Sequence, residues 1–379
     1  MYKVESYING QSSSESNNSG KIYNPSYGTE IGEVLYSTND VAYKAVESAY
    51  QASKAWSKTG LSFRAELILK FRQGVINRSK EIIEICISEA GKTRPDAEAE
   101  LDRAVQALTH AAGVQHFYPS NYSQNVAGGI DIADLRFPIG VIAGVGPFNF
   151  PILIPILHSA MALVTGNTYI AKPSEKVPSI SRLYADIWNE AGLPDGCYNV
   201  VHGEKEIVEL LVKHEKVDGL AFIGSTVAAK SLKMLGVEHN TKVQALGGGK
   251  NHMIVLPDAD LDMSADAAVS ASFGAAGQRC MAVSVVVAVG DIADELISKI
   301  QSRMPDLIMG VTDDEKTQLG PVISQANKDK IYSFIDSAEP DGASLVVDGR
   351  HRSNSLEGCF VGPTLIDNVK PGMSVYENE

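Results

Sequence analysis

Four short apolar runs in the middle of the chain most constrain its fold. They are rich in Val, Ile and other apolar residues, helical segments separate them, and they cover Val141 to Val145, Thr168 to Lys172, Tyr198 to His202 and Leu220 to Gly224. Continuously apolar strands that alternate with helices are typical of a parallel sheet covered on both faces. Right-handed crossovers between such strands produce a doubly wound sheet. The sequence therefore predicts an α/β protein built on a doubly wound parallel sheet.

A glycine or proline stands at the carboxyl end of each run, namely Gly146, Pro173, Gly203 and Gly224. In open parallel sheets, ligands bind beyond the carboxyl ends of the strands. We therefore expect a nucleotide cleft where these four residues lie.

The rest of the chain suggests more than one domain, because 379 residues exceed what one ordinary core buries. Apolar residues recur at helical spacing from Asp40 to Lys58 and from Phe63 to Ala90, and the polar run Gln11 to Ser19 is expected to be a surface loop. Alternation around Gly128-Gly129 predicts a β-hairpin, a candidate oligomerisation arm. The expected division is 1–123 with 139–246 as a nucleotide-binding domain, 124–138 as the hairpin, and 247–379 as a second α/β, catalytic domain.

Composition excludes several classes of function. The formal net charge of −13 disfavours nucleic acid and anionic membranes as partners. Four scattered cysteines encode neither a disulfide framework nor a zinc site, so no metal is expected. The apolar stretch from Phe148 to Val164 is shorter than a membrane-spanning helix and is interpreted as a buried helix. The amino terminus lacks the pattern of a signal or transit peptide, so a cytoplasmic location is expected.

Cys280 is the candidate nucleophile. It follows an Ala-rich helical run and precedes the strand-like segment Val283 to Val289, and the adjacent Arg279 favours the reactive thiolate electrostatically. The alternative is a small buried hydrophobe, the commonest role of a lone cysteine. A second candidate, Asn149, lies just past a sheet strand and offers a neutral amide donor for a developing oxyanion.

Four motifs occur in the chain in a family order: Pro147-Phe148-Asn149-Phe150-Pro151, Lys172-Pro173-Ser174-Glu175, Phe222-Ile223-Gly224-Ser225-Thr226 and Gly277-Gln278-Arg279-Cys280. Together they resemble the aldehyde dehydrogenase superfamily from about Tyr7 to Glu379. Within it, the segments Ala245 to Met253 and Gly277 to Ala282 resemble the CoA-acylating (methyl)malonate-semialdehyde dehydrogenases.

The resemblance implies a role for each matching residue. Cys280 would attack the aldehyde, Asn149 and the Cys280 N–H would hold the oxyanion, and hydride would pass to NAD. Glu175 would accept from the ribose 2′-hydroxyl and repel a 2′-phosphate, which favours NAD over NADP. Without the motif, Lys172 and Glu175 could be ordinary surface charges. The implied NAD-binding residues are Pro147, Phe148, Lys172, Ser174, Glu175, Gly224, Ser225, Gly247 and Glu379.

Ala245 is the most informative departure from the family pattern, since hydrolytic members carry there the Glu that activates the deacylating water. A methyl group cannot act as a base, so the thioester is expected to await coenzyme A. Another carboxylate could also substitute for the missing Glu. Arg103 and Arg279 match the positions that would bind a substrate carboxylate, although Arg103 could instead form a solvated ion pair with neighbouring glutamates.

Family members continue past the position of Glu379, so the resemblance implies an incomplete catalytic domain in this chain. Three functions stay open. The first is NAD-dependent oxidation of malonate or methylmalonate semialdehyde with decarboxylation and acyl transfer to coenzyme A. In the full-length form the resemblance implies a homo-oligomer (dimer or tetramer). The others are a hydrolytic NAD-dependent aldehyde dehydrogenase and a catalytically silent chain that binds NAD.

Overall fold

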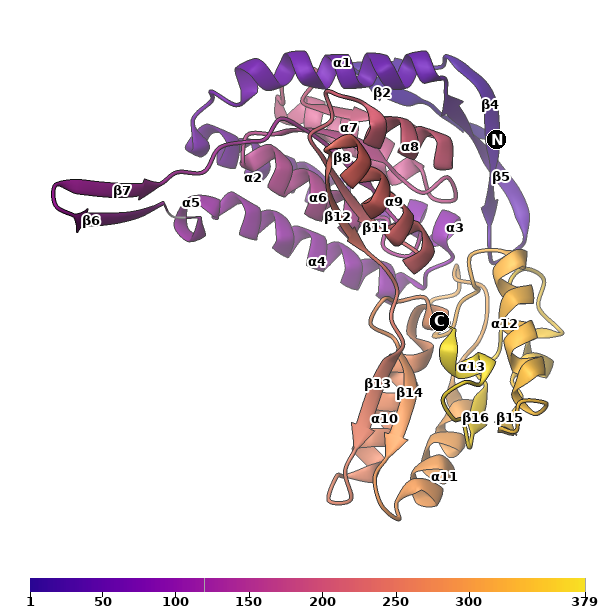
Figure 1. The fold of residues 1–379 in the computed structure, drawn as a ribbon. Coiled ribbons are helices and arrows are strands. Elements are labelled where there is room, and N and C mark those ends of the chain that lie inside the picture. Colours follow the sequence, from indigo (N-terminus) through magenta and orange to yellow (C-terminus); the bar gives the residue numbers. More distant parts are fainter. Residues whose placement is uncertain (119, 379) are drawn as a thin grey trace. The chain divides into compact units, whose positions relative to one another are not determined.

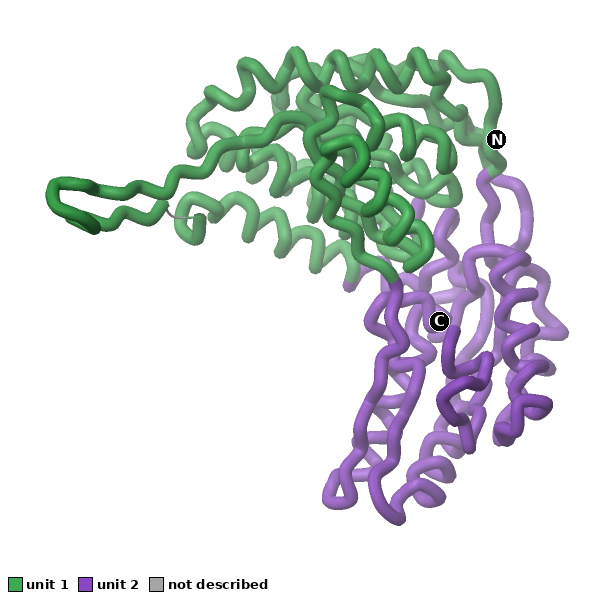
Figure 2. Tube along the Cα trace, in the orientation of Figure 1, with its two compact units in different colours: residues 1–21, 32–82, 100–247 green, residues 22–31, 83–99, 248–379 purple. Residues whose placement is uncertain are grey.

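The computed structural model describes residues 1–118 and 120–378, and the chain divides into two compact units (Figure 2). Unit 1 contains Met1–Lys21, Gly32–Ile82 and Glu100–Gly247, and unit 2 contains Ile22–Ile31, Ile83–Ala99 and Gly248–Glu379. The segments 22–31 and 83–99 depart from the division expected from the sequence. Residues late in the chain form hydrogen bonds with the first of these segments. For example, the Cys359 N–H donates to the Pro25 carbonyl at 2.9 Å.

A seven-stranded sheet forms the centre of unit 1 and confirms the predicted parallel α/β architecture (Figure 1). Its five parallel strands pair in the order β12-β11-β8-β9-β10, and β2 and β3 extend the β10 edge in antiparallel fashion. The strands are β12 (Lys242–Leu246), β11 (Gly219–Ile223), β8 (Val141–Val145), β9 (Thr168–Lys172), β10 (Tyr198–Val200), β2 (Ser6–Ile8) and β3 (Gln11–Ser13).

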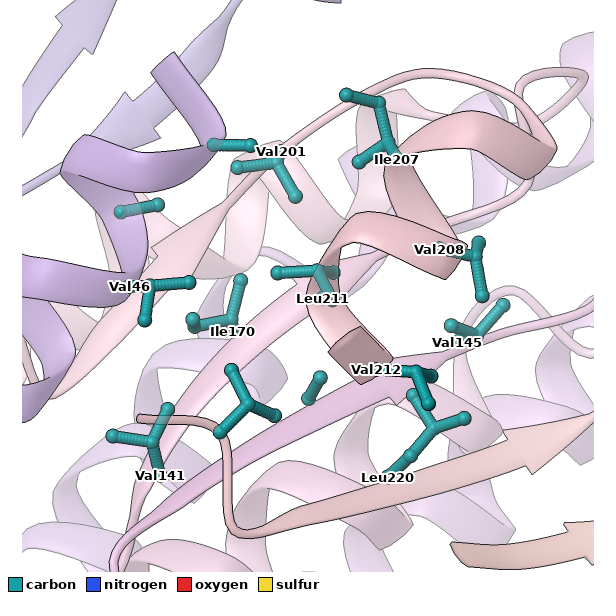
Figure 3. Close-up of a cluster of buried hydrophobic side chains, with 14 of the residues drawn as sticks. Val46, Val141, Val145, Ile170, Val201, Ile207, Val208, Leu211, Val212 and Leu220 are labelled. Carbon is teal, nitrogen blue, oxygen red and sulfur yellow. The ribbon is translucent and has the colours of Figure 1, made fainter. Parts of the chain in front are cut away.

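Three helices, α1 (Asn39–Trp56), α8 (Lys205–Lys213) and α9 (Thr226–His239), cover one face of this sheet. Helix α1 begins at a cap in which the Thr38 hydroxyl accepts from the Val41 N–H at 3.1 Å. Figure 3 shows the core between these helices and the strands, where Leu211 of α8 lies among Val46, Ile170 and Val201. This layer is almost entirely aliphatic.

The other face carries α2 (Leu61–Asn77), α6 (Leu153–Val164) and α7 (Ser179–Ala191). Phe71 of α2 stacks on Trp188 of α7 with ring centroids 3.8 Å apart, and both side chains are fully buried. Helices α4 (Arg94–Ala112) and α5 (Val114–Phe117) follow α3 (Ser79–Ala90) in the chain. Among the described residues, no helix combines the length and apolarity needed to cross a bilayer.

The predicted β-hairpin is present, formed by β6 (Asn121–Ala127) and β7 (Ile130–Asp134) around Gly128-Gly129. It projects from the rest of unit 1 (Figure 1), and every residue of both strands is exposed. The hairpin strands begin three residues before the expected position and end at Asp134.

Two expectations about the amino-terminal third are wrong. Residues 11–19 are not a loop: they contribute β3 and the start of β4 (Ser16–Asn24), which belongs to a small sheet with β1 (Tyr2–Val4) and β5 (Thr29–Ser37). Edge strands are held by backbone hydrogen bonds, so a polar sequence can form them. The helical stretch 63–90 is also interrupted, because α2 ends at Asn77 and α3 begins at Ser79.

Unit 2 contains two small sheets and the helices packed on them. Strands β13 (Asn251–Val255) and β14 (Val283–Ala288) pair in parallel, and β15 (Ser344–Val347) and β16 (Leu365–Asp367) pair antiparallel. Its core joins α10 and α11 to the first sheet through buried side chains that include Val255, Val269 and Ile300. The helices are α10 (Leu261–Phe273), α11 (Ala293–Arg303), α12 (Gln325–Ala338) and α13 (Ser374–Glu377).

Candidate active site

The carboxyl ends of the parallel strands lie along one edge of the unit 1 sheet. After β8 the chain adds β9 and β10 on one side and later adds β11 and β12 on the other. The strand order therefore switches direction between β8 and β11, which is where doubly wound sheets bind ligands. Gly146 follows β8 and Gly224 follows β11 at this position.

The segment after β8 carries Pro147, Phe148 and Asn149, and all three are half-buried. Its first residue is tied to the sheet, since the Gly146 N–H donates to the Lys172 carbonyl at 3.2 Å. The segment then runs directly into α6. The structure therefore places Asn149 on a short, anchored connection at the carboxyl edge of the sheet.

A buried carboxylate holds the start of α6, and the sequence analysis missed it. One oxygen of Glu100, Oε1, accepts the N–H groups of both Ile152 and Leu153 at 2.8 Å. Glu100 is only 4% exposed. A helix start has free N–H donors and a partial positive charge, and both are satisfied by this carboxylate. The available signal was that Glu100 lies next to Leu101 on the apolar face of α4.

Lys172, at the end of β9, is buried rather than an ordinary surface charge. Its Nζ lies 3.5 Å from Oε2 of Glu175, and its side chain is 6% exposed. Burial lowers the pKa of Lys172, and Glu175 opposes that shift. Ser174, also buried, accepts from the Lys176 N–H at 3.3 Å, and the Lys176 ammonium lies 5.7 Å from the centre of the Phe148 ring. The structure therefore brings four of the predicted NAD-binding residues into one neighbourhood.

Tyr36 and Glu204 also belong to this neighbourhood, although neither lies in a recognised motif. The Tyr36 hydroxyl donates to Oε1 of Glu204 at 3.4 Å. Burial, followed by the charges of Glu204 and Glu175, raises the pKa of Tyr36 to about 12. Both carboxylates also act on Lys172, so the lysine lies in a negative field.

Helix α9 begins after its N-cap Ser225, beside the predicted cofactor residues Gly224 and Gly247. Ser225 caps the helix by accepting from the Ala228 N–H at 3.3 Å, and Ser225 and Thr226 are exposed. Gly247 lies against this turn, because a Cβ added to it would be 2.9 Å from the Thr226 Cα. Only glycine permits that approach. Gly224 is similarly restricted by the Phe222 ring, at 2.6 Å from an added Cβ.

Cys280 lies on an exposed loop of unit 2, between the short 3-10 helix Gly274–Gly277 and β14. The other three cysteines, Cys86, Cys197 and Cys359, are buried. Burial raises the pKa of the Cys197 thiol to about 12, so it stays protonated. Exposure therefore separates Cys280 from the three buried cysteines.

Three side chains anchor the Cys280 loop. The Arg279 guanidinium forms an ion pair with Asp96, in the first turn of α4. Gln278 accepts from the Ile323 N–H at 2.9 Å. Asn251, at the start of β13, donates to the carbonyls of Cys280 and Ala282, each at 2.9 Å. Neither Asp96 nor Asn251 was predicted from the sequence to belong to the site.

The remaining predicted residues have simpler surroundings. Arg103 is exposed on α4 and donates to Oε1 of Gln106 at 3.1 Å. Ala245 of β12 is half-buried and packs against the aliphatic core of unit 1. Glu379, expected to contact the nicotinamide ribose, lies outside the described residues.

Comparison with known proteins agrees with this geometry. The sequence model of the Aldehyde dehydrogenase family matches residues 12–379. A malonate-semialdehyde dehydrogenase of Bacillus pumilus (strain SAFR-032) is 38% identical over 379 residues, which cover 99% of this chain and 78% of the relative.

Two solved structures are similar throughout the chain. The methylmalonate-semialdehyde dehydrogenase of Oceanimonas doudoroffii superimposes with a TM-score of 0.97 at 39% identity, covering 100% of this chain and 78% of that one. A Sinorhizobium meliloti 1021 protein described as a methylmalonate-semialdehyde dehydrogenase, in complex with NAD, gives a TM-score of 0.96 at 38% identity with the same coverage. The chain therefore belongs to the aldehyde dehydrogenase family.

Proposed function

We propose that this chain oxidises malonate or methylmalonate semialdehyde with NAD and transfers the resulting acyl group to coenzyme A. The proposal is carried by the exposed thiol of Cys280, in a chain whose sequence has Ala245 at the position where the resemblance expects the carboxylate of hydrolytic family members. The relatives named above act on semialdehydes of this class, and one was solved with NAD.

The proposed chemistry begins at Cys280. Its thiolate attacks the aldehyde carbon to form a hemithioacetal, whose negative oxygen would accept from the Cys280 N–H; the resemblance to the family assigns the Asn149 amide as a second donor. NAD, when bound, takes the hydride that leaves this carbon. The product on the enzyme is a thioester. Its β-carboxylate leaves as carbon dioxide, the electron pair of the broken C–C bond passes into the thioester enolate, and that enolate takes up a proton from solvent. No metal is required for these steps.

The residues of unit 1 fit a dinucleotide with a free 2′-hydroxyl. Lys172 can donate to ribose hydroxyls, and Glu175 can accept from one, while Ser174 and the Pro147-Phe148 segment border the same edge. Ser225 caps α9 and Gly247 approaches its first turn closely, and the first N–H groups of this helix would bind the pyrophosphate. A 2′-phosphate would meet the negative charge of Glu175, so NAD is favoured over NADP.

Coenzyme A is the proposed acyl acceptor. Ala245 cannot remove a proton from water, so the thioester persists until a stronger nucleophile arrives. A thiolate attacks a thioester without needing a protein base at this position.

Arg279 and Arg103 are the proposed partners of the substrate carboxylate. A guanidinium binds a carboxylate through two parallel hydrogen bonds. Arg279 already forms an ion pair with Asp96. A substrate carboxylate would therefore have to bind Arg279 together with Asp96 or displace Asp96 from it. Arg103 is exposed and needs no such exchange.

The test is NADH formation from the semialdehyde with and without coenzyme A. We expect a single burst, stoichiometric with enzyme, in its absence, and steady turnover after it is added. Cys280→Ser is the matched control and should abolish the burst while NAD still raises the melting temperature.

Steady turnover in water alone would identify a hydrolytic enzyme instead. A chain that NAD stabilises but that neither forms NADH nor is labelled at Cys280 would be a silent binder.

We also propose that the hairpin β6–β7 mediates homo-oligomerisation. An isolated two-stranded hairpin is marginally stable in water, yet this one exposes apolar side chains such as Ile130 and Ile132, each 55% exposed. Replacing both by Lys should lower the mass measured by light scattering to that of a smaller assembly, and an unchanged mass would contradict the proposal.

A further inference from the structure

The backbone of the Cys280 loop is not held by regular secondary structure. Ala275 and Ala276 have positive φ angles of 51° and 53°, which side chains other than glycine rarely adopt. After them, a turn closes where the Ala282 N–H donates to the Arg279 carbonyl at 3.0 Å. Cys280 is the second residue of this turn. The orientation of its side chain therefore depends on the contacts that other segments make with the turn.

Asn251 supplies that external restraint. Its side-chain nitrogen donates to two carbonyls of the turn, those of Cys280 and Ala282, each at 2.9 Å. An amide nitrogen has two N–H donors, so one side chain can satisfy both carbonyls. An aspartate of the same shape would present only oxygens to them.

The pairing of β13 with β14 is irregular at the same place. Asn251 pairs with Val283 and the next residue, His252, pairs with Val285, so Ser284 has no partner in the register. Such bulges are common beside active sites, where they redirect a neighbouring side chain. Here the irregularity begins at Asn251, the residue of β13 whose side chain donates to the Cys280 turn.

We infer that Asn251 is a positioning residue for the thiol chemistry of Cys280. By fixing the two carbonyls on either side of Met281, its amide sets the direction of the Cys280 side chain and of the Cys280 N–H. The inference rests on the proposed function, because the N–H matters only if it stabilises an oxyanion there. It does not require Asn251 to touch substrate or cofactor.

The experiment compares Asn251→Asp and Asn251→Ala with Asn354→Ala, a change at an exposed residue of the same unit. Three quantities are measured: the rate of the NADH burst, the rate of Cys280 alkylation by iodoacetamide, and hydrogen exchange of the amides from 278 to 283. Alkylation needs no oxyanion donor, so it reports access to the thiol and the fraction that is thiolate. Asn251→Ala adds no charge and therefore separates these two contributions.

For Asn251→Asp we expect the burst rate to fall by about 100-fold, the typical cost of one misplaced oxyanion donor. Asn251→Ala should lose about 10-fold or more, since water can partly replace the amide. Alkylation should change by less than about 3-fold, exchange from 280 to 282 should accelerate, and Asn354→Ala should match the wild type.

An unchanged burst in Asn251→Asp would overturn the inference, and so would equal losses of burst and alkylation, which indicate general collapse of the loop. A wild-type chain without any burst would refute the proposed function instead. The exchange measurement then still decides whether Asn251 holds the turn, because unchanged exchange in both variants would overturn the inference by itself.

Discussion

The contact between Glu100 and the start of α6 is open to direct measurement. Glu100→Ala removes a carboxylate that accepts two N–H groups at 2.8 Å. A hydrogen bond to a charged group contributes about 1.5–3 kcal/mol. Because both bonds end on one oxygen, their contributions overlap. We therefore expect the free energy of unfolding to fall by about 3–5 kcal/mol, comparable to breaking a buried charged pair.

The assay follows from where the tryptophans lie. The chain has two, Trp56 and Trp188, and both are buried in unit 1 together with Glu100 and α6. Tryptophan fluorescence in a urea titration therefore reports the unit that carries the substitution. Glu100→Gln, which keeps an acceptor oxygen but no charge, should lose about 1–2 kcal/mol.

Glu98→Ala is the matched control, since Glu98 lies two residues earlier on α4 and is exposed. It should change stability by no more than about 0.5 kcal/mol. If Glu100→Ala and Glu98→Ala unfold at the same urea concentration with the same slope, the carboxylate does not stabilise α6 and the reasoning fails.

Three further predictions concern other parts of the chain. Burial lowers the pKa of His202 to about 3 and of His158 to about 4. In the unfolded chain both imidazoles have the ordinary pKa of 6.5, so they take up protons as the pH falls below that value. Stability should therefore decrease as pH falls from 6.5 toward 4, by up to about 1.4 kcal/mol per pH unit for each imidazole; urea titrations that give a flat profile there would contradict this. Ala245→Glu should raise NADH turnover without coenzyme A by about 10²-fold, and steady-state assays that find no rise would show that a base at this position is insufficient. Gly247→Ala should weaken NAD binding about 10-fold by displacing the start of α9, whereas Gly128→Ala, in open space, should leave the calorimetric Kd unchanged.

The sequence predicted the parallel sheet well because its strands are buried on both faces. Burial forces continuous apolar runs, and the four runs named from the sequence are β8, β9, β10 and β11 within one or two residues. The edge strands β3 and β4 carry no such pattern, since their polar side chains face solvent. Their backbone partners are specified by the fold and not by local sequence.

The site was predictable only where a residue belongs to a motif. Cys280 and Lys172 were found in that way, and the structure adds that one is exposed and the other buried. Glu100, Asp96 and Asn251 act on backbone groups or charges far away in the sequence. Glu100 and Asp96 look locally like any polar residue of a helix, and the resemblance of the segment Ala245 to Met253 assigned no role to Asn251. Their roles follow from long-range hydrogen bonds and ion pairs, which no local pattern encodes.

The division of the chain into alternating segments has a consequence for its synthesis. Three segments of unit 1 alternate with three of unit 2, so the backbone passes between the units five times. The stretches 22–31 and 83–99 leave the ribosome early but complete their unit only after residues beyond Gly248 emerge. Ile22 and Cys86, whose side chains are fully covered in the complete structure, belong to these early stretches. Before the residues beyond Gly248 are synthesised, apolar side chains of the incomplete unit 2 would be a binding surface for a chaperone that recognises hydrophobic segments.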